Sequence, residues 1–206
     1  MSLSQPKGNI FVISGPSGTG KSTIRKKLLS IFPHLKFSVS YTTRPLRKEE
    51  KEGIDYHLIS HKQFEEMINK GEFAEWAEVH GHLYGTPAQP LKSAIAKGED
   101  ILLEIDVQGG EKIKTTFPEA VLIFILPPNF KELENRIHTR AMDNQEEIKR
   151  RLQIARREII AGKNYHYLVL NDSLEHCLQQ IKPIIISQSY RTERQISLLN
   201  KIIANS

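Results

Sequence analysis

A glycine-rich segment near the start of the chain directly follows a short apolar run. Residues 15–22 read GPSGTGKS, a full match to G-x-x-x-x-G-K-[ST], and residues 10–13 before them read IFVI. A loop of this kind lies between a strand and the N-terminus of a helix, where successive backbone N–H groups bind phosphate. A helix is expected next, over 24–31, and Pro33 ends it. A glycine-rich turn without a ligand is the alternative, but the placement between strand and helix favours a nucleoside triphosphate site.

The side chains of this loop have distinct expected roles. Lys21 contacts the outer phosphates as a point charge, and the Ser22 hydroxyl coordinates a magnesium ion that bridges two phosphate groups. Thr23 lies one residue deeper in the helix. The candidate triphosphate-binding residues here are Gly15, Pro16, Ser17, Gly18, Thr19, Gly20, Lys21, Ser22 and Thr23.

Length and composition indicate a single folded unit. The 206 residues, 39% of them hydrophobic, suffice for a sizeable core. No run approaches the roughly 18 apolar residues of a membrane span, and the first seven residues lack the apolar centre of a secretion signal. Cys177 is the only cysteine, so no internal disulfide forms. These features predict a cytoplasmic protein with no membrane partner.

The basic residues bear on the class of ligand. Lys and Arg number 29 against 24 Asp and Glu, a formal charge of +5, which is compatible with nucleic-acid binding. A continuous basic stripe would favour nucleic acid, whereas separate clusters favour discrete phosphate sites. The arginines fall in separate clusters, at Arg44 and Arg47, at Arg136 and Arg140, and at 150–151. We therefore expect small phosphorylated ligands and no nucleic acid.

The rest of the chain alternates apolar runs with helical patterns. The nearly continuous apolar runs at 101–106, 120–125 and 167–170 are typical of strands covered on both faces. Helical stretches lie between and around them, at 87–97, 109–116, 129–140 and 146–160. The predicted fold class is α/β, a parallel sheet with helices on both faces.

Two segments interrupt this alternation. The first, at about 38–86, is rich in Arg, Glu, Tyr and His, holds a single helical stretch near 62–70, and is a candidate substrate subdomain. The second, 130–154, has a polar break at 141–144, where Asp143 and Asn144 are each followed three residues later by a glutamate. That spacing resembles a capping box that starts a new helix. A helix pair with a mobile tip would form a lid.

The first inserted segment predicts a second phosphate-binding centre. Residues 38–47 read SVSYTTRPLR and Tyr56 follows, so small hydroxyl residues, Arg44, Arg47 and a tyrosine lie within one short stretch. Arginine binds phosphate through a bidentate fork, and a tyrosine hydroxyl adds a neutral donor. A solvated basic loop is the alternative, weakened by the intact phosphate loop elsewhere in the chain.

Glu75 is a candidate for recognising a base. In an extended segment it shares a face with Phe73 and Ala77, which places a carboxylate among apolar neighbours, where it needs a partner. The N1–H and exocyclic amine of guanine are adjacent donors that one carboxylate accepts together. Because Glu72, Glu75 and Glu78 are spaced by three, a surface glutamate on a helix is an equally open alternative.

Taken together, these segments resemble the guanylate kinase family, whose members transfer the terminal phosphoryl group of ATP to GMP. The resemblance rests on the phosphate loop and on SYTTR at 40–44, DY at 55–56, EWA at 75–77, YGT at 84–86, EIDVQG at 104–109 and VLND at 169–172. It covers nearly the whole chain. It implies a P-loop nucleoside monophosphate kinase fold with a core (1–37, 87–129 and 155–206), an inserted GMP-binding subdomain (38–86) and a helical lid (130–154).

The resemblance also implies roles for individual residues. Those matching the GMP phosphate ligands are Arg44, Arg47, Tyr56 and Tyr84, and those matching the guanine-reading positions are Ser40, Glu75, Thr86 and Glu104. Asp106 matches an acidic residue near magnesium, acting through water, and Asn171 a residue near the adenine of ATP. The matches to the lid arginines are Arg136, Arg140 and Arg151; with Lys21 and Arg44 these form the implied catalytic set. The implied ligands are ATP with Mg²⁺ and GMP, with dGMP as a second candidate acceptor.

Three alternatives to this function differ in class. A guanylate-kinase-like module that binds partners without catalysis shares the fold, but the intact phosphate loop and the lid arginines argue against it. A small kinase acting on a sugar phosphate shares the loop, but would not need Glu75 or the run at 40–47. Nucleic-acid binding is the third alternative, disfavoured by the clustered charge.

The C-terminal stretch, 190–203, has Ile196, Leu199 and Ile203 at helical spacing. It predicts a helix that docks on the core or, alternatively, forms a subunit contact in a homo-oligomer.

Overall fold

The parallel sheet expected from the apolar runs forms the centre of the molecule. The computed structural model describes residues 7–79, 81–140 and 145–204. Its larger sheet has the strand order β2-β7-β1-β8-β9, and every neighbouring pair is parallel. The strands are β1 (Ile10–Ser14), β2 (Lys36–Phe37), β7 (Ile101–Glu104), β8 (Val121–Leu126) and β9 (Tyr167–Leu170). The predicted fold class is confirmed.

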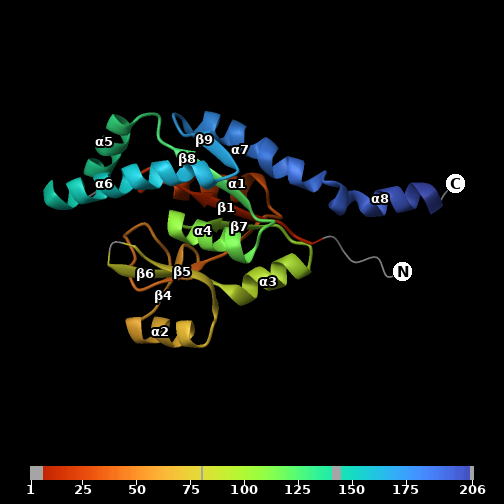
Figure 1. Ribbon diagram of the computed structural model, residues 1–206, viewed down its shortest axis with the longest axis horizontal. Helices are drawn as coiled ribbons and strands as arrows, with labels where there is room; N and C mark the ends of the chain where they lie inside the picture. Colours follow the sequence, from red (N-terminus) through yellow and green to blue (C-terminus); the bar gives the residue numbers. More distant parts are fainter. Residues whose placement is uncertain (1–6, 80, 141–144, 205–206) are drawn as a thin grey trace.

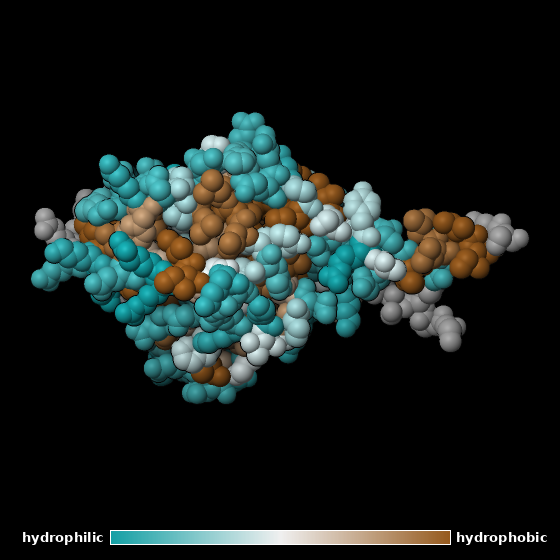
Figure 2. Space-filling view, turned by 45° about the horizontal axis from the view of Figure 1, so that its top comes forward, coloured by the Kyte–Doolittle hydropathy of each residue, from teal (hydrophilic) through white to brown (hydrophobic). Residues whose placement is uncertain are grey.

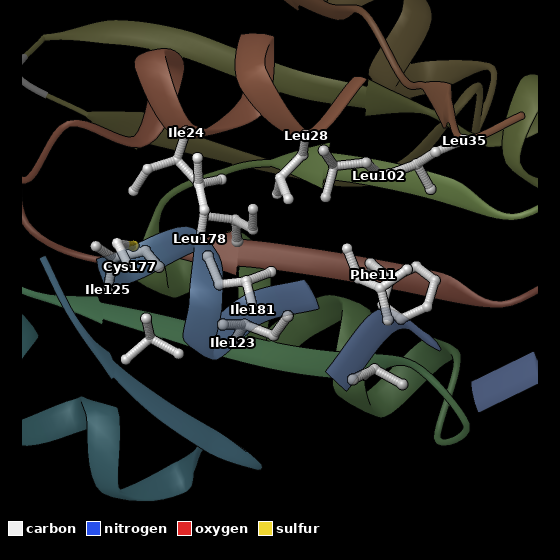
Figure 3. Packing of buried hydrophobic residues seen from close by; sticks show 14 residues of the cluster. Phe11, Ile24, Leu28, Leu35, Leu102, Ile123, Ile125, Cys177, Leu178 and Ile181 are labelled. Atoms are coloured by element: carbon white, nitrogen blue, oxygen red, sulfur yellow. The ribbon is translucent and has the colours of Figure 1, made fainter. Parts of the chain in front are cut away.

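Helices cover both faces of this sheet, as the alternation within β1 requires. Phe11 and Ile13 pack on one face with Ile24 and Leu28 of α1 (Lys21–Ile31) and with the buried side of α7 (Leu174–Ser189). Figure 3 shows Cys177 inside this cluster, so the thiol is a packing residue. Ile10 and Val12 pack on the opposite face with α3 (Ala88–Ala96) and α4 (Val107–Thr116).

The segment after β2 forms a smaller second sheet, with the order β4-β3-β6-β5. Its elements are β3 (Ser40–Thr42), β4 (Tyr56–Leu58), α2 (His61–Asn69), β5 (Phe73–Val79) and β6 (His82–Pro87). In β5, Glu75 and Ala77 are buried while Trp76 and Glu78 are exposed, the alternation of a strand with one covered face. Glu75 therefore lies on a strand, and the helical alternative is wrong.

Two further helices, α5 and α6, lie above the small sheet and apart from it in the view of Figure 1. They are α5 (Phe130–Arg140) and α6 (Gln145–Ala161), joined by apolar contacts among Leu133, Ile137, Ile148 and Ala155. The predicted break at 141–144 lies outside the described residues, as does its proposed capping box. A short 3₁₀ turn, η1 (Gly162–Asn164), leads into β9.

Three sequence predictions need correction. Strand β7 ends at Glu104 and not at Asp106, because the Asp106 carboxylate accepts a hydrogen bond from the Gly109 backbone N–H (2.8 Å) and caps α4. For the same reason α4 begins at Val107, two residues before the predicted start. Helix α1 likewise begins at Lys21, not at residue 24, because the phosphate loop runs directly into it.

The C-terminal stretch forms the predicted helix, but this helix is largely exposed. The predicted helix exists as α8 (Thr192–Ala204), and Arg194 in its first turn donates to Asp100 and to the Gly98 carbonyl. None of its residues is buried, so the expected packing of its apolar residues on the core is absent. It projects from the body in Figure 1, and hydrophobic side chains gather over it in Figure 2. Across the described residues, no helix is both long and apolar enough to cross a membrane.

Candidate active site

The phosphate loop connects β1 to α1 at the carboxyl edge of the central sheet. Gly20 has a φ of 86°, a left-handed conformation that glycine adopts without strain. A side chain there would also begin 2.8 Å from Nδ2 of Asn171, which donates a hydrogen bond to the Thr19 carbonyl (2.6 Å). Buried Asn171 therefore holds the far side of the loop.

Three side chains of the loop have different surroundings. The ammonium group of Lys21 donates to the carbonyl oxygens of Gly15 (2.6 Å) and Pro16 (3.0 Å), so it lies across the loop. The Ser22 hydroxyl donates to Oε1 of Glu104 (2.6 Å), which joins the first turn of α1 to β7. Thr19 is fully buried and donates to the Pro16 carbonyl (2.8 Å), so its side chain supports the loop from behind.

Two carboxyl groups lie near Lys21. Burial raises the pKa of Asp106, and hydrogen bonds from the backbone of Gly109 and Gln108 oppose that rise. Burial also raises the pKa of Glu158 on α6, against the opposing charge of Lys21. Glu158 was not among the predicted site residues. It lies two turns after Arg151 on the same face of α6, so the helical periodicity could have identified it.

The small sheet contributes a cluster of arginine and tyrosine. The guanidinium of Arg44 donates through Nε to the Tyr84 hydroxyl (2.9 Å) and through Nη2 to both carboxylate oxygens of Glu50 (2.9 and 2.8 Å). Arg47 lies farther from Glu50, at 3.9 Å, and its side chain is 63% exposed. The ring of Tyr56 meets the ring of Tyr84 edge-on at 5.9 Å. Glu50 was not among the predicted site residues, yet it organises both arginines.

Glu75 lies at the buried end of this cluster. Its Oε1 accepts a hydrogen bond from the hydroxyl of Thr86 (2.5 Å), on the neighbouring strand β6. The side chain is only 7% exposed, and burial, together with the nearby charge of Asp106, raises its pKa to about 7 against the opposing hydrogen bond from Thr86. A half-ionised carboxyl group at neutral pH is typical of a functional position.

Helices α5 and α6 also approach the phosphate loop. Nη2 of Arg151 on α6 donates to the Ser17 hydroxyl (2.8 Å), a direct contact between α6 and the loop. Nε of Arg136 pairs with Glu132 one turn earlier on α5 (3.0 Å). The backbone of Arg140 ends α5, but its side chain is not among those described.

One cleft brings most of these groups together. The predicted residues that line it are Gly15, Ser17, Gly18, Gly20, Lys21, Ser22, Ser40, Arg44, Arg47, Tyr56, Glu75, Tyr84, Glu104 and Asp106. The lining residues that were not predicted are Glu50, Val79, Ile105 and Glu158. The predicted residues that do not line it are Pro16, Thr19, Thr23, Thr86, Arg136, Arg151 and Asn171.

Four of the predicted residues outside the cleft differ in their surroundings. Thr86, Thr19 and Asn171 are buried and act on groups that line the cleft, Thr86 on Glu75 and the other two on the loop. Thr23 is exposed on α1 and lines a neighbouring hollow that shares Ser22, Ser40 and Glu104 with the cleft.

Comparisons with known proteins agree with this geometry. The sequence model of the family described as guanylate kinase matches residues 7–188. The chain belongs to the guanylate kinase family. It is 46% identical to guanylate kinase of Syntrophotalea carbinolica over 187 residues, covering 91% of this chain and 89% of that protein. It is 41% identical to guanylate kinase of Geobacter sulfurreducens over 198 residues, covering 96% and 98%.

A solved structure shows the same architecture. The crystal structure of guanylate kinase from Anaplasma phagocytophilum superposes with a TM-score of 0.78 at 34% identity, covering 92% of this chain and 90% of that one. The family resemblance seen in the sequence motifs is thus confirmed by both sequence and fold.

The raised pKa of Glu75 in this guanylate kinase family member predicts a pH-dependent stability. In the unfolded chain this carboxyl group titrates near 4.5, so the folded state disfavours its ionised form. Its contribution to stability is therefore fully present below pH 4.5 and is lost as pH rises through about 7. The shift corresponds to about 3 kcal/mol of unfolding free energy.

Urea unfolding at several pH values measures this effect. Relative to Glu75→Gln, the wild type should lose roughly 2–3 kcal/mol between pH 4.5 and pH 8, because the variant lacks the titrating group. Glu78→Gln, on the exposed face of the same strand, is the control and should track the wild type. A difference between the wild type and Glu75→Gln that is constant with pH would contradict the raised pKa.

Proposed function

We propose that this protein transfers the terminal phosphoryl group of ATP to GMP, giving ADP and GDP. The observation that carries the proposal is the single cleft that joins the phosphate loop at one end to the Arg44, Tyr84 and Glu75 cluster at the other. Two anionic nucleotides bound in one cleft fit in-line phosphoryl transfer, which depends on positioning and on neutralising charge. The family assignment supports the same reaction.

ATP binds at the phosphate loop in this proposal. The backbone N–H groups of residues 15–20 and the N-terminus of α1 cradle its phosphates, and Lys21 turns from the loop carbonyls to the outer phosphates. Asn171 lies behind the loop and contacts the adenine side of the site, while Thr23 extends the first turn of α1.

GMP binds at the small sheet. Its phosphate is bound by Arg44, Arg47, Tyr56 and Tyr84. The hydrogen bond from Arg44 to the Tyr84 hydroxyl already fixes these two phosphate donors relative to each other. The guanine lies against the buried end of the cleft, and its recognition is assigned to Ser40, Glu75, Thr86 and Glu104. Glu75 accepts the N1–H and the amine of guanine, and Thr86 orients its carboxylate.

The residues at the phosphate loop fit a magnesium ion. Ser22 and Asp106 present hard oxygen atoms to the same cleft, the kind of ligand that Mg²⁺ takes alongside phosphate and water. Ser22 would bind the ion directly and Asp106 through water. When bound, the ion neutralises charge on the phosphates.

The protein's own groups do the remaining work of the reaction. Arg136, Arg140 and Arg151 of the lid stabilise the transferring group, with Arg151 already held at the loop by Ser17. The acceptor is a phosphate, ionised near neutral pH, so no general base is needed. Closing of the lid (130–154) and the GMP subdomain (38–86) over the core (1–37, 87–129 and 155–206) excludes water and suppresses ATP hydrolysis.

The alternatives make different demands on these residues. A non-catalytic binding module does not need a complete phosphate loop with Lys21 and Ser22 in place, and a sugar phosphate kinase does not need a buried carboxylate at Glu75. Nucleic-acid binding does not explain why the arginines are held in separate sites. A cytoplasmic location and dGMP as a second acceptor belong to the same proposal.

The role of Glu75 predicts strong selectivity for GMP over AMP. A site built to accept hydrogen bonds from guanine leaves its carboxylate unpaired against adenine, so kcat/KM should favour GMP by roughly 10⁴. Glu75→Gln should lower kcat/KM for GMP by about 10² or more with little change for AMP, and Glu78→Gln should change neither. Comparable kcat/KM values of the wild type for GMP and AMP would refute the assignment of Glu75.

The role of Lys21 predicts a loss of turnover. Lys21→Ala removes a preorganised positive charge from the outer phosphates, so kcat should fall by about 10² or more in a coupled assay with ATP and GMP. Lys27→Ala, exposed on the same helix, is the matched control and should keep normal turnover. Near-normal turnover in a folded Lys21→Ala protein would show that transfer occurs elsewhere.

We also propose that α8 forms a contact between two copies of this chain. Its exposed apolar residues are Ile196, Leu198, Leu199, Ile202 and Ile203. In antiparallel packing about a two-fold axis, the same apolar face of α8 meets itself from the partner subunit. A two-fold contact of this kind covers both apolar faces at once.

Light scattering after size exclusion tests this contact. The wild type should be a homo-oligomer, and Leu199→Lys should shift it to monomer by placing a charge in the apolar face. Ser197→Lys, exposed off the face shared by Ile196, Leu199 and Ile203, should leave the mass unchanged. A monomeric wild type at micromolar concentration would refute the proposal.

A further inference from the structure

A buried arginine contacts a residue that lines the cleft but belongs to none of the sequence motifs. Arg25 is on α1, one turn after Lys21, and is only 3% exposed. Its guanidinium packs over the ring of Phe37 at 4.3 Å and forms ion pairs with two carboxylates from distant parts of the chain, Asp55 and Glu104.

The first carboxylate, Glu104, lines the cleft at the end of β7. Its Oε2 lies 3.1 Å from Nε of Arg25, and its Oε1 accepts the hydroxyl of Ser22 at 2.6 Å. Both oxygens are therefore held by α1, and the side chain is 9% exposed. The orientation of Glu104 toward the cleft depends on Arg25 and Ser22 together.

The second carboxylate, Asp55, belongs to the small sheet. Its Oδ1 pairs with Arg25, and its Oδ2 accepts the backbone N–H of Lys51 (3.0 Å). Arg25 also reaches the carbonyl of Ile54 at 3.4 Å. Because Tyr56, which lines the cleft, directly follows, these contacts fix the entry to β4 relative to α1.

The charges explain why Asp55 stays ionised in this buried position. Burial raises its pKa, but hydrogen bonds from Arg25 and the Lys51 backbone, together with the charges of Arg25 and Lys26, hold the pKa below its usual range. One buried cation thus lies between the buried carboxylate of Asp55 and the largely buried carboxylate of Glu104. Such clusters contribute little net stability compared with apolar packing, so stability alone does not account for this one.

We propose that Arg25 is a positioning residue for GMP binding, which holds Glu104 toward the cleft and fixes the Asp55–Tyr56 turn against the phosphate-loop helix. This inference rests on the proposed function. Without the guanidinium, the carboxylates of Glu104 and Asp55 lose their shared counter-ion and repel each other. Glu104 and Tyr56 then leave their positions at the GMP end, while the backbone of the phosphate loop is unchanged.

Steady-state kinetics with ATP and GMP test the proposal. Arg25→Met keeps much of the apolar stem and removes the charge; it should raise KM for GMP at least 10-fold while KM for ATP changes less than about 3-fold. Arg25→Lys should recover part of the GMP affinity. Lys26→Met removes an exposed charge 3.6 Å from the same Asp55 oxygen and is the matched control, with both KM values close to wild type.

A second variant keeps the test independent of how well Arg25→Met folds. Asp55→Asn should also raise KM for GMP, and combined with Arg25→Met it should add less than the product of the two single effects, because both break one ion pair. A lower Tm with unchanged KM values in Arg25→Met, or no change in Asp55→Asn, overturns the proposal. A wild type that does not phosphorylate GMP would instead refute the proposed function.

Discussion

Parallel pairing of β1 with β7 and β8 sets the position of the phosphate-loop end of the cleft. The register joins Ile13 to Glu104 on one side of β1 and Ser14 to Phe124 on the other, so the phosphate loop leaves the sheet beside the end of β7. Because the loop leaves the sheet at this point, the hydroxyl of Ser22, at the start of α1, donates a hydrogen bond to the carboxylate of Glu104. A shift of one residue along β7 would turn Glu104 to the opposite face of the sheet and remove this contact.

The cleft combines cationic and acidic groups, and their arrangement follows from the ligands that it is proposed to hold. Lys21 and Arg44 are each bonded within the protein to acceptors, loop carbonyls in one case and Glu50 in the other. Acceptors of this kind keep cationic side chains near the cleft and restrict their conformations, which reduces the entropy lost when a phosphate replaces the acceptor. Glu75 is different, because burial disfavours its charge until a donor pair approaches.

Local sequence patterns predicted most of the helices and strands and many of the residues that line the cleft. The residues that they did not predict have physical reasons. The phosphate loop was readable because its glycines, its lysine and its flanking strand and helix are contiguous in sequence. Glu75 was ambiguous, since spacing by three and alternation by two both fit residues 72–78, and pairing of β5 with β6 decides for the strand.

Arg25 could not be predicted from any local window. It lies in a polar stretch of α1 that reads as a solvated face, and only the tertiary fold brings Asp55 and Glu104, 30 and 79 residues away, to its guanidinium. Helix α8 shows the opposite case. Its apolar spacing correctly predicts a helix, but periodicity does not specify what covers the apolar face.

The contact between α5 and the phosphate loop depends on the absence of a side chain at Gly18. With a φ of 91°, this residue has a backbone conformation that favours glycine, and a β-carbon there would lie 3.3 Å from Leu133 and 3.4 Å from Ile137. Leu133 and Ile137 both belong to the small apolar cluster that joins α5 to α6. The loop therefore packs directly on the cluster that joins α5 to α6, and Arg151 of α6 donates a hydrogen bond to Ser17, one residue earlier. The stretch 17–18 therefore contacts both helices, α5 through the apolar side chains beside Gly18 and α6 through the hydrogen bond from Arg151 to Ser17, and a bulkier residue at position 18 would disturb both contacts.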